Sequence, residues 1–368
     1  MSWLQLTAVI TAAAAVTFGL TPLVRDLAFK AGLVDQPDER KVHTKGIPRL
    51  GGVAIFAGMM AAVGLQVVGE ATLGWKPALT SGNPQILGCI AAMVIIFVTG
   101  LIDDIRTLSP AQKLAGQTLA AAVVIASGLR IDFIGNPFGG RIIVLGLLSI
   151  PLTALYIVAF ANVINLIDGL DGLAAGVTAI GAVTMLVLAL QGNQFAAAAF
   201  AAALIGACVA FLRYNFHPAT IFMGDSGSML LGFTLAAISL LGVMKSVAAI
   251  ALLVPLLILG VPIFDTASAI IRRVLHNRPI QEADRGHIHH RLLGRGFDQR
   301  QTVLIIYVWS AALGVGAYAM RWAATPVKVL TFAVLAGLSV FMAHWLGLFE
   351  VAHQQAEDLT SEDHPAAG

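Results

Sequence analysis

Long apolar runs, interrupted by short clusters of polar residues, dominate this 368-residue chain. A run of about 18 or more apolar residues is long enough to cross the hydrocarbon core of a bilayer as a helix. The runs and the residues that break them predict spans at 3–24, 47–67, 85–102, 113–130, 142–165, 172–190, 194–212, 227–243, 247–271, 302–320 and 327–348. The pattern therefore predicts an all-α integral membrane protein, a polytopic bundle of about eleven transmembrane helices.

Composition agrees with this architecture. Hydrophobic residues make up 58% of the chain and charged residues 11%, whereas about 25% of residues are charged in soluble domains. No internal repeat divides the spans, so residues 1–349 are expected to form one polytopic transmembrane domain. Residues 350–368 are acidic and poor in apolar side chains, which predicts a disordered cytoplasmic tail.

Four polar clusters follow the third, fifth, seventh and ninth predicted spans, so all four are expected on one face of the membrane. They are Asp103-Asp104, 162–171, 224–226 and 287–290. That face also collects 16 of the 22 lysine and arginine residues, and the cytoplasmic side of membrane proteins carries the excess of basic residues. We therefore expect a cytoplasmic active site, an outside N-terminus, a cytoplasmic C-terminus and a small outer-face hairpin at 131–144.

The residues of these clusters suggest a site for a cation and phosphate. Asp103 and Asp104 end the third span, where carboxylates near hydrocarbon are costly and usually functional; a solvated helix end is the alternative. Asp225 directly precedes the eighth span, where the free N–H groups of a helix N-terminus favour anions; a plain N-cap is the alternative there.

The second cluster has a three-residue period that places its polar side chains roughly along one helical face. Its members are Asn162, Asn165, Asp168 and Asp171. Gly169 and Gly172 are expected to break the helix where it meets a ligand. Together with Asp225 these groups supply the hard oxygen ligands that Mg²⁺ prefers, with Mn²⁺ as an alternative. Since Mg²⁺ commonly binds through one or two carboxylates and substrate phosphates, a diphosphate substrate is indicated.

Two basic segments flank these clusters, one at 25–49 and one at 272–301, which contains the histidines. Residues 25–49 end in Lys-Gly-Ile-Pro-Arg-Leu-Gly-Gly, whose glycines and proline are expected to let the backbone approach a ligand closely. His287, His289 and His290 match no strong zinc spacing, so phosphate or sugar contacts are the preferred interpretation. A basic inward face suits phosphate-bearing ligands and anionic membrane lipid, and does not indicate nucleic acid.

These motifs carry a family resemblance. The Asp-Asp pair, Asn-Val-Ile-Asn-Leu-Ile-Asp-Gly-Leu-Asp-Gly at 162–172, Phe-Met-Gly-Asp-Ser-Gly-Ser at 222–228 and His-Ile-His-His at 287–290 resemble the polyprenyl-phosphate N-acetylhexosamine-1-phosphate transferases over nearly the whole chain. The resemblance implies a bacterial inner-membrane enzyme that uses a UDP-sugar and undecaprenyl phosphate and releases UMP. The histidine motif and the stretch at 40–52 are more similar to the N-acetylglucosamine branch. The phospho-N-acetylmuramoyl-pentapeptide transferases are the alternative branch.

The resemblance also implies residue roles. Asp103 and Asp104 would position or deprotonate the acceptor phosphate, and Asp225 with Asn165 would hold the metal. The remaining family positions would bind substrate: Lys45, Lys113, Asn162, Asp168, Asp171, Phe222, Arg285, His287, His289 and His290. Of these, Lys113 would lie near the acceptor phosphate, Phe222 would stack on uracil, and the histidines and Arg285 would meet sugar and diphosphate. Many relatives carry a third aspartate where this chain has Thr107, so that position has no carboxylate role here.

A membrane transporter is the rival from another class, because carboxylates within the membrane and glycine-broken helices also mark transport pathways. The acidic groups of this chain cluster at one face instead of the midplane, and no repeated half is visible, which argues against transport. A homodimer is a further candidate assembly.

Overall fold

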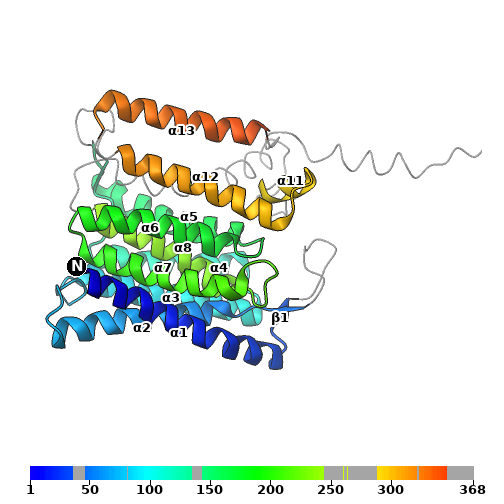
Figure 1. Ribbon diagram of the computed structural model, residues 1–368. Helices are drawn as coiled ribbons and strands as arrows, with labels where there is room; N and C mark the ends of the chain where they lie inside the picture. Colours follow the sequence, from blue (N-terminus) through cyan, green and yellow to red (C-terminus); the bar gives the residue numbers. More distant parts are fainter. Residues whose placement is uncertain are drawn as a thin grey trace, which may run out of the picture.

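The computed structural model describes residues 1–35, 46–80, 82–134, 143–243, 260, 263, 288–320 and 323–345. Its long helices are α1 (Trp3–Lys30), α2 (Gly51–Thr72), α3 (Pro84–Arg106), α4 (Pro110–Ala126), α5 (Ser149–Ile167), α6 (Leu173–Gln191), α7 (Phe195–Asn215), α8 (Gly224–Val243), α12 (Gln299–Met320) and α13 (Thr325–Trp345). The short elements are η1 (Gly146–Leu148) and α11 (Ile288–Gly294). Figure 1 shows the long helices lying side by side as a bundle.

The predicted helical membrane architecture is confirmed. Eight helices in the described ranges are long and apolar enough to cross a membrane, judged by length and composition. Helix α4, with 17 residues, and the apolar part of α13 at Pro326–Met342 are shorter. The predicted span at 247–271 falls almost wholly outside the described residues, as does the tail at 350–368. Helix α1 continues to Lys30, so the connecting segment begins six residues later than predicted.

Two small antiparallel pairs lie at opposite ends of the bundle. Strand β1 (Val34–Asp35) pairs with β2 (Ile47–Pro48), and β3 (Phe133–Ile134) pairs with β4 (Ile143–Val144). The second pair confirms the hairpin predicted at 131–144. The first pair leads into α2 at the end of the bundle where α11 also lies (Figure 1).

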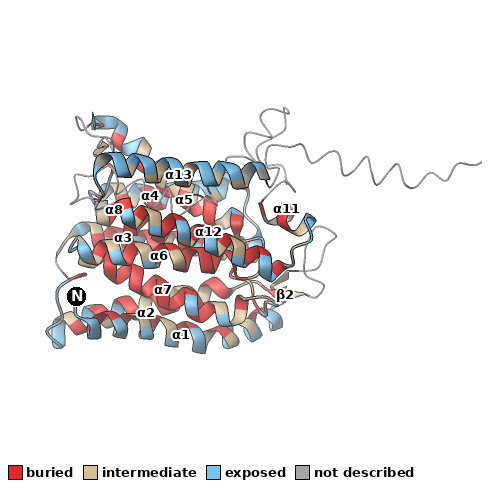
Figure 2. Cartoon of the chain, turned by 45° about the horizontal axis from the view of Figure 1, so that its top comes forward, coloured by how far each residue is buried: buried red, intermediate tan, exposed pale blue. Residues whose placement is uncertain are grey.

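Helix α8 occupies the centre of the bundle. It packs against α3 and α5 most extensively, and also against α2, α6 and α7. Figure 2 shows buried residues concentrated in these inner helices, whereas α1 and α13 keep exposed outer faces. Because neighbouring helices run in alternating directions, the C-terminal ends of α3 and α5 meet the N-terminal ends of α4 and α8. Polar residues placed at those ends in the sequence are therefore brought together.

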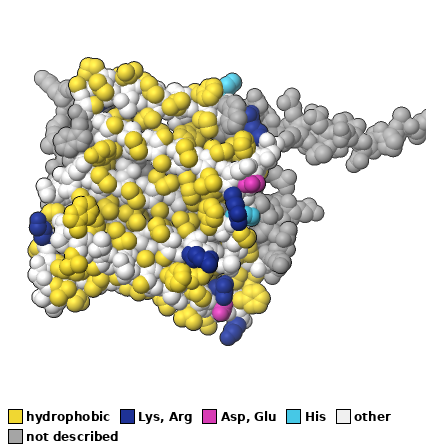
Figure 3. Space-filling model, in the orientation of Figure 1, with side chains coloured by type: hydrophobic (Ala, Val, Ile, Leu, Met, Phe, Trp, Pro, Cys, Tyr) yellow, Lys and Arg dark blue, Asp and Glu magenta, His cyan; other side chains and the backbone are white. Residues whose placement is uncertain are grey.

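The flank of the bundle is suited to lipid. Large hydrophobic side chains such as Leu27, Leu119 and Val308 are exposed there. In Figure 3 the visible flank is largely hydrophobic, and most of the charged side chains in view gather near the end that holds β1 and α11. An apolar surface of this extent matches hydrocarbon instead of water.

The glycines that open α2 serve helix packing. The N–H groups of Gly51 and Gly52 donate to the carbonyl oxygens of Phe222 and Met223 at 2.9 and 2.8 Å. A Cβ at Gly52 would overlap the backbone of Gly227 in α8. The close backbone approach that these two glycines allow is to the first turn of α8, and the predicted approach of this segment to a ligand stays a prediction.

Candidate active site

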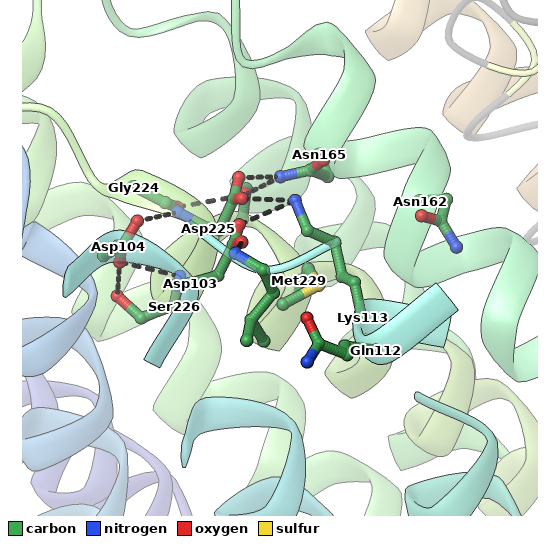
Figure 4. Close-up of polar contacts among 12 residues, drawn as sticks. Asp103, Asp104, Gln112, Lys113, Asn162, Asn165, Gly224, Asp225, Ser226 and Met229 are labelled. Atoms are coloured by element: carbon green, nitrogen blue, oxygen red, sulfur yellow. Dashed lines mark hydrogen bonds and ion pairs between the residues drawn. The ribbon is translucent and has the colours of Figure 1, made fainter. Parts of the chain in front are cut away.

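Lys113 joins two carboxylates at the meeting point of α3, α4 and α8. Its Nζ lies 2.7 Å from Oδ2 of Asp103 and 2.6 Å from Oδ2 of Asp225. Figure 4 shows the three side chains converging from their separate helices. Asp103 is nearly buried, and its other oxygen accepts the backbone N–H of Leu108 at 2.6 Å. One positive charge therefore sits between two negative ones, a short distance inside the end of the bundle.

Asn165 reaches Asp225 from the last turn of α5. Its Nδ2 donates to Oδ1 of Asp225 at 2.5 Å and to Oγ of Ser228 at 2.8 Å. The structure thus brings together Asp103, Lys113, Asn165 and Asp225, all of which were predicted to be site residues. Oδ1 of Asn165 takes no part in these two bonds and is available as an oxygen ligand.

Asp104 binds the N-terminus of α8. Its Oδ1 accepts the N–H of Asp225 at 2.7 Å, and its Oδ2 accepts the N–H and hydroxyl of Ser226 at 3.0 and 2.6 Å. Gly224 has a φ of +70°, and a Cβ there would lie 2.5 Å from Asp104. The helix N-terminus predicted to bind substrate anions is therefore partly occupied by the chain's own carboxylate, which also fixes the position of Asp225.

The prediction that four polar residues share one helical face was wrong. Helix α5 ends at Ile167, so Asp168 and Asp171 lie in the turn that follows it. Asn162 points away from the cluster (Figure 4). It exchanges hydrogen bonds with the buried side chain of Gln117 in α4, at 2.7 and 3.2 Å. The predicted break near Gly169 and Gly172 is confirmed, and Gly172 has a φ of +79°.

Asp171 anchors the turn at 168–172. Its Oδ2 lies 2.8 Å from Nδ1 of His217 and accepts the N–H of Ala219 at 3.0 Å. Oδ1 of Asn215 accepts the N–H of Gly172 at 3.1 Å, and the hydroxyl of Tyr307 donates to the Gly172 carbonyl at 2.5 Å. Helices α7 and α12 therefore hold this turn in place, and Asp171 organises it.

Asp168 stands at the end of α5, outside the membrane-spanning helices. Burial raises the pKa of its carboxyl well above the usual range, and the nearby carboxylates of Asp225, Asp104 and Asp171 raise it further. A cation bound among these carboxylates would oppose that shift by favouring the ionised form. Because the raised pKa favours the neutral carboxyl, the turn without a cation adds oxygen atoms, and not a full negative charge, beside Asp225.

The donor atoms fit a hard cation. Asp225, Asn165, Asp103 and Ser228 offer oxygen atoms, and a positive charge is already accommodated between Asp103 and Asp225 by Lys113. Among the described residues, no three His, Cys, Asp or Glu side chains form a ready metal cage. A hard cation such as Mg²⁺ takes few protein ligands and completes its shell with water and phosphate oxygens, so the oxygen atoms of Asp225 and Asn165 are the candidate ligands. This donor set does not suit a structural zinc ion.

Several predicted substrate-binding residues lie outside this description. Lys45, Arg285 and His287 fall outside the described ranges. His289 and His290 belong to α11, which lies at the same end of the bundle as β1 (Figure 1), and their side chains are not described. Phe222 lies three residues before Asp225 and pairs with the segment before α2, its N–H donating to the Pro48 carbonyl at 2.8 Å.

Sequence reasoning missed the residues that hold the site in shape. Gln117 follows Lys113 by four positions, which places both on one face of α4, and this spacing was a usable signal. Asn215, His217 and Tyr307 carried no comparable signal, because the residues of the 168–172 turn that they contact lie at least 43 positions away along the chain. Ser226 and Ser228 lie within the motif at 222–228, but the motif alone does not indicate a role for either hydroxyl.

The chain is similar to a known family and to several known proteins. Residues 86–243 match the family described as Glycosyl transferase family 4, and this range contains the whole Asp103, Lys113, Asn165 and Asp225 cluster. A probable undecaprenyl-phosphate N-acetylglucosaminyl 1-phosphate transferase of Bacillus subtilis (strain 168) is 42% identical over 329 residues, covering 89% of this chain and 88% of that protein.

Two further relatives are similar over most of their length. The decaprenyl-phosphate N-acetylglucosaminephosphotransferase of Mycolicibacterium smegmatis is 39% identical over 329 residues, covering 83% of this chain and 79% of its own. The undecaprenyl-phosphate alpha-N-acetylglucosaminyl 1-phosphate transferase of Yersinia pestis is 30% identical over 300 residues, covering 79% and 78%.

Proposed function

Because this chain belongs to glycosyl transferase family 4, we propose that it transfers N-acetylglucosamine 1-phosphate from a UDP-sugar to a polyprenyl phosphate. The relatives named for this reaction with undecaprenyl or decaprenyl phosphate cover most of the chain. The product would be a lipid-linked sugar that begins a cell-envelope polysaccharide, and UMP would be released. Undecaprenyl phosphate is the acceptor named for the Bacillus and Yersinia proteins.

One observation carries the proposal, the Lys113 ammonium held between Asp103 and Asp225 at one end of the bundle. At this end of the bundle, the phosphate of a lipid can approach the cluster from the membrane, and a nucleotide-sugar can approach it from water. A transporter would need its polar groups along a path through the bundle. The described cluster instead lies at the ends of α3, α4, α5 and α8.

The reaction is a displacement at the β-phosphorus of the donor. An oxygen of the polyprenyl phosphate forms the new bond to this phosphorus, and the bond to the bridging oxygen of UMP breaks. The lipid phosphate needs no strong base, since its second pKa is about 6 and it is largely a dianion at neutral pH. Lys113 would attract that dianion, and the fixed positions of Asp225 and Asn165 would orient the donor.

We further propose that Asp225 and Asn165 hold Mg²⁺, with Mn²⁺ as a substitute. When bound, the ion would supply positive charge to the diphosphate oxygens as negative charge shifts toward UMP. The oxygen-only donor set of the described residues supports this choice. Asp104 would act by holding the first turn of α8, and Asp168 would add negative charge beside the ion.

The proposed activity is tested with purified protein, undecaprenyl phosphate and a panel of UDP-sugars, by measuring UMP and the lipid-linked product. We expect turnover with UDP-N-acetylglucosamine or its C4 epimer and none with UDP-muramoyl-pentapeptide, since sugar-binding groups left unpaired by a wrong substrate can discriminate strongly. A reaction without lipid is the control. Turnover of the pentapeptide donor alone would assign the chain to the muramoyl branch, and UMP release independent of lipid would refute transfer.

We also propose that the site faces the cytoplasm in a bacterial inner membrane, because the basic residues gather at that end. Both native cysteines are buried, so introduced thiols can be read against a low background. Ala111→Cys, at the start of α4, should react with an impermeant thiol reagent only from the cytoplasmic side. Val144→Cys, on β4 and 78% exposed, should react only from outside. Labelling of both positions from one side would contradict the orientation.

A further inference from the structure

Arg49 carries a guanidinium that has no acceptor within the described part of the chain. Its Nε is buried and makes no hydrogen bond. Buried polar groups in folded proteins nearly always have a partner, because leaving one unpaired costs free energy. The arrangement points to an anion that completes this position when it binds.

The backbone around Arg49 is firmly held beside Phe222. The N–H of Arg49 donates to the Leu33 carbonyl at 3.2 Å, and Arg49 pairs with Phe222 in a parallel bridge. The next residues of the segment donate to the carbonyls of Phe222 and Met223. Arg49 is therefore fixed to the same strand-like segment that leads directly into Gly224 and Asp225.

Other arginines with described contacts are already satisfied. Arg25 pairs with Asp26 at 2.9 Å, and Arg130 pairs with Asp132 at 2.8 Å. Arg300 donates to the His217 carbonyl at 3.1 and 3.2 Å. Arg49 differs from them in combining a buried donor with the lack of any acceptor among the described residues.

The guanidinium fork matches phosphate in geometry and charge, since its planar N–H groups bind two phosphate oxygens at once. The donor and the acceptor of the proposed reaction both bring phosphate. The link to Phe222, which precedes the Asp225 turn, favours the nucleotide-sugar. We propose that Arg49 binds a phosphate of the nucleotide-sugar donor, an inference that rests on the proposed function.

Kinetics with both substrates test this assignment. Arg49→Gln should raise the KM for UDP-N-acetylglucosamine about tenfold or more, the effect of losing one charged hydrogen bond, while the KM for undecaprenyl phosphate stays unchanged. Arg49→Lys should have an intermediate effect, because it keeps the charge and loses the fork. Arg25→Gln is the matched control, since it removes the same charge from the same end of the bundle at a paired arginine, and should change neither constant.

Binding without turnover separates this inference from the proposed reaction. Wild-type protein should bind UMP more tightly than uridine, and Arg49→Gln should lose most of that difference with an unchanged melting temperature. A rise in the KM of undecaprenyl phosphate alone would assign Arg49 to the acceptor and overturn the inference. Unchanged constants and an unchanged UMP preference in both Arg49 variants would also overturn it. A wild-type protein that prefers UMP but turns over no UDP-sugar would instead refute the proposed function.

Discussion

Replacing Asp225 with asparagine is expected to lower transfer activity by about 100-fold or more, the scale seen when one charge-stabilising group is removed from an active site. The substitution keeps the shape of the side chain and removes its charge. Asp225 contacts Lys113 at 2.6 Å and Asn165 at 2.5 Å, so one change weakens both the ion pair and the proposed Mg²⁺ site. Initial rates of UMP release across a Mg²⁺ titration measure the effect.

The same experiment needs a control for charge and folding. Asp132→Asn removes one carboxylate charge at the opposite end of the bundle, where Asp132 pairs with Arg130, and should leave the rate unchanged. Size-exclusion profiles and melting temperatures should match for both variants. The metal proposal fails if folded Asp225→Asn turns over normally, or if a chelator leaves wild-type activity intact.

Asp104→Asn is expected to reduce activity by about tenfold to 100-fold, as two backbone donors lose a charged acceptor. The amide keeps one acceptor oxygen and turns an N–H₂ group toward the N–H groups of α8. The first turn of α8 should then shift and carry Asp225 with it. We therefore expect the Mg²⁺ concentration for half-maximal rate to rise together with the loss of rate.

A general base at this position would behave differently. Its loss would reduce kcat and change the pH profile while leaving the Mg²⁺ requirement as in the wild type, and that result would overturn the positioning role. Ser226→Ala is the graded comparison, because it removes one of the three bonds to Asp104 and keeps the two backbone donors. Ser226→Ala should therefore lower the transfer activity less than Asp104→Asn does.

The spacing of apolar runs was sufficient to predict the helices and the end of the bundle where the polar groups gather. A span must bury a nearly continuous stretch of apolar side chains and satisfy its own backbone hydrogen bonds, so its position is encoded locally. For that reason the predicted break at Gly169 and Gly172 and the predicted gap between the spans 172–190 and 194–212 agree with the observed helix ends, whereas α8 begins three residues before its predicted span. Alternation of direction then places Asp103, Lys113, Asn165 and Asp225 at the same level.

Which of these groups touch was decided only by tertiary packing. Asp104 meets Ser226 across 122 positions of sequence, Asn162 meets Gln117 across 45, and Asp171 meets His217 across 46. A polar residue at a helix end can turn toward several neighbours, and its choice depends on how closely the helices approach. The sequence by itself therefore determined the membrane architecture and the composition of the site. The tertiary structure decided that Asp104 holds the turn bearing Asp225, that Asn162 faces away, and that Arg49 is left with a buried donor beside Phe222.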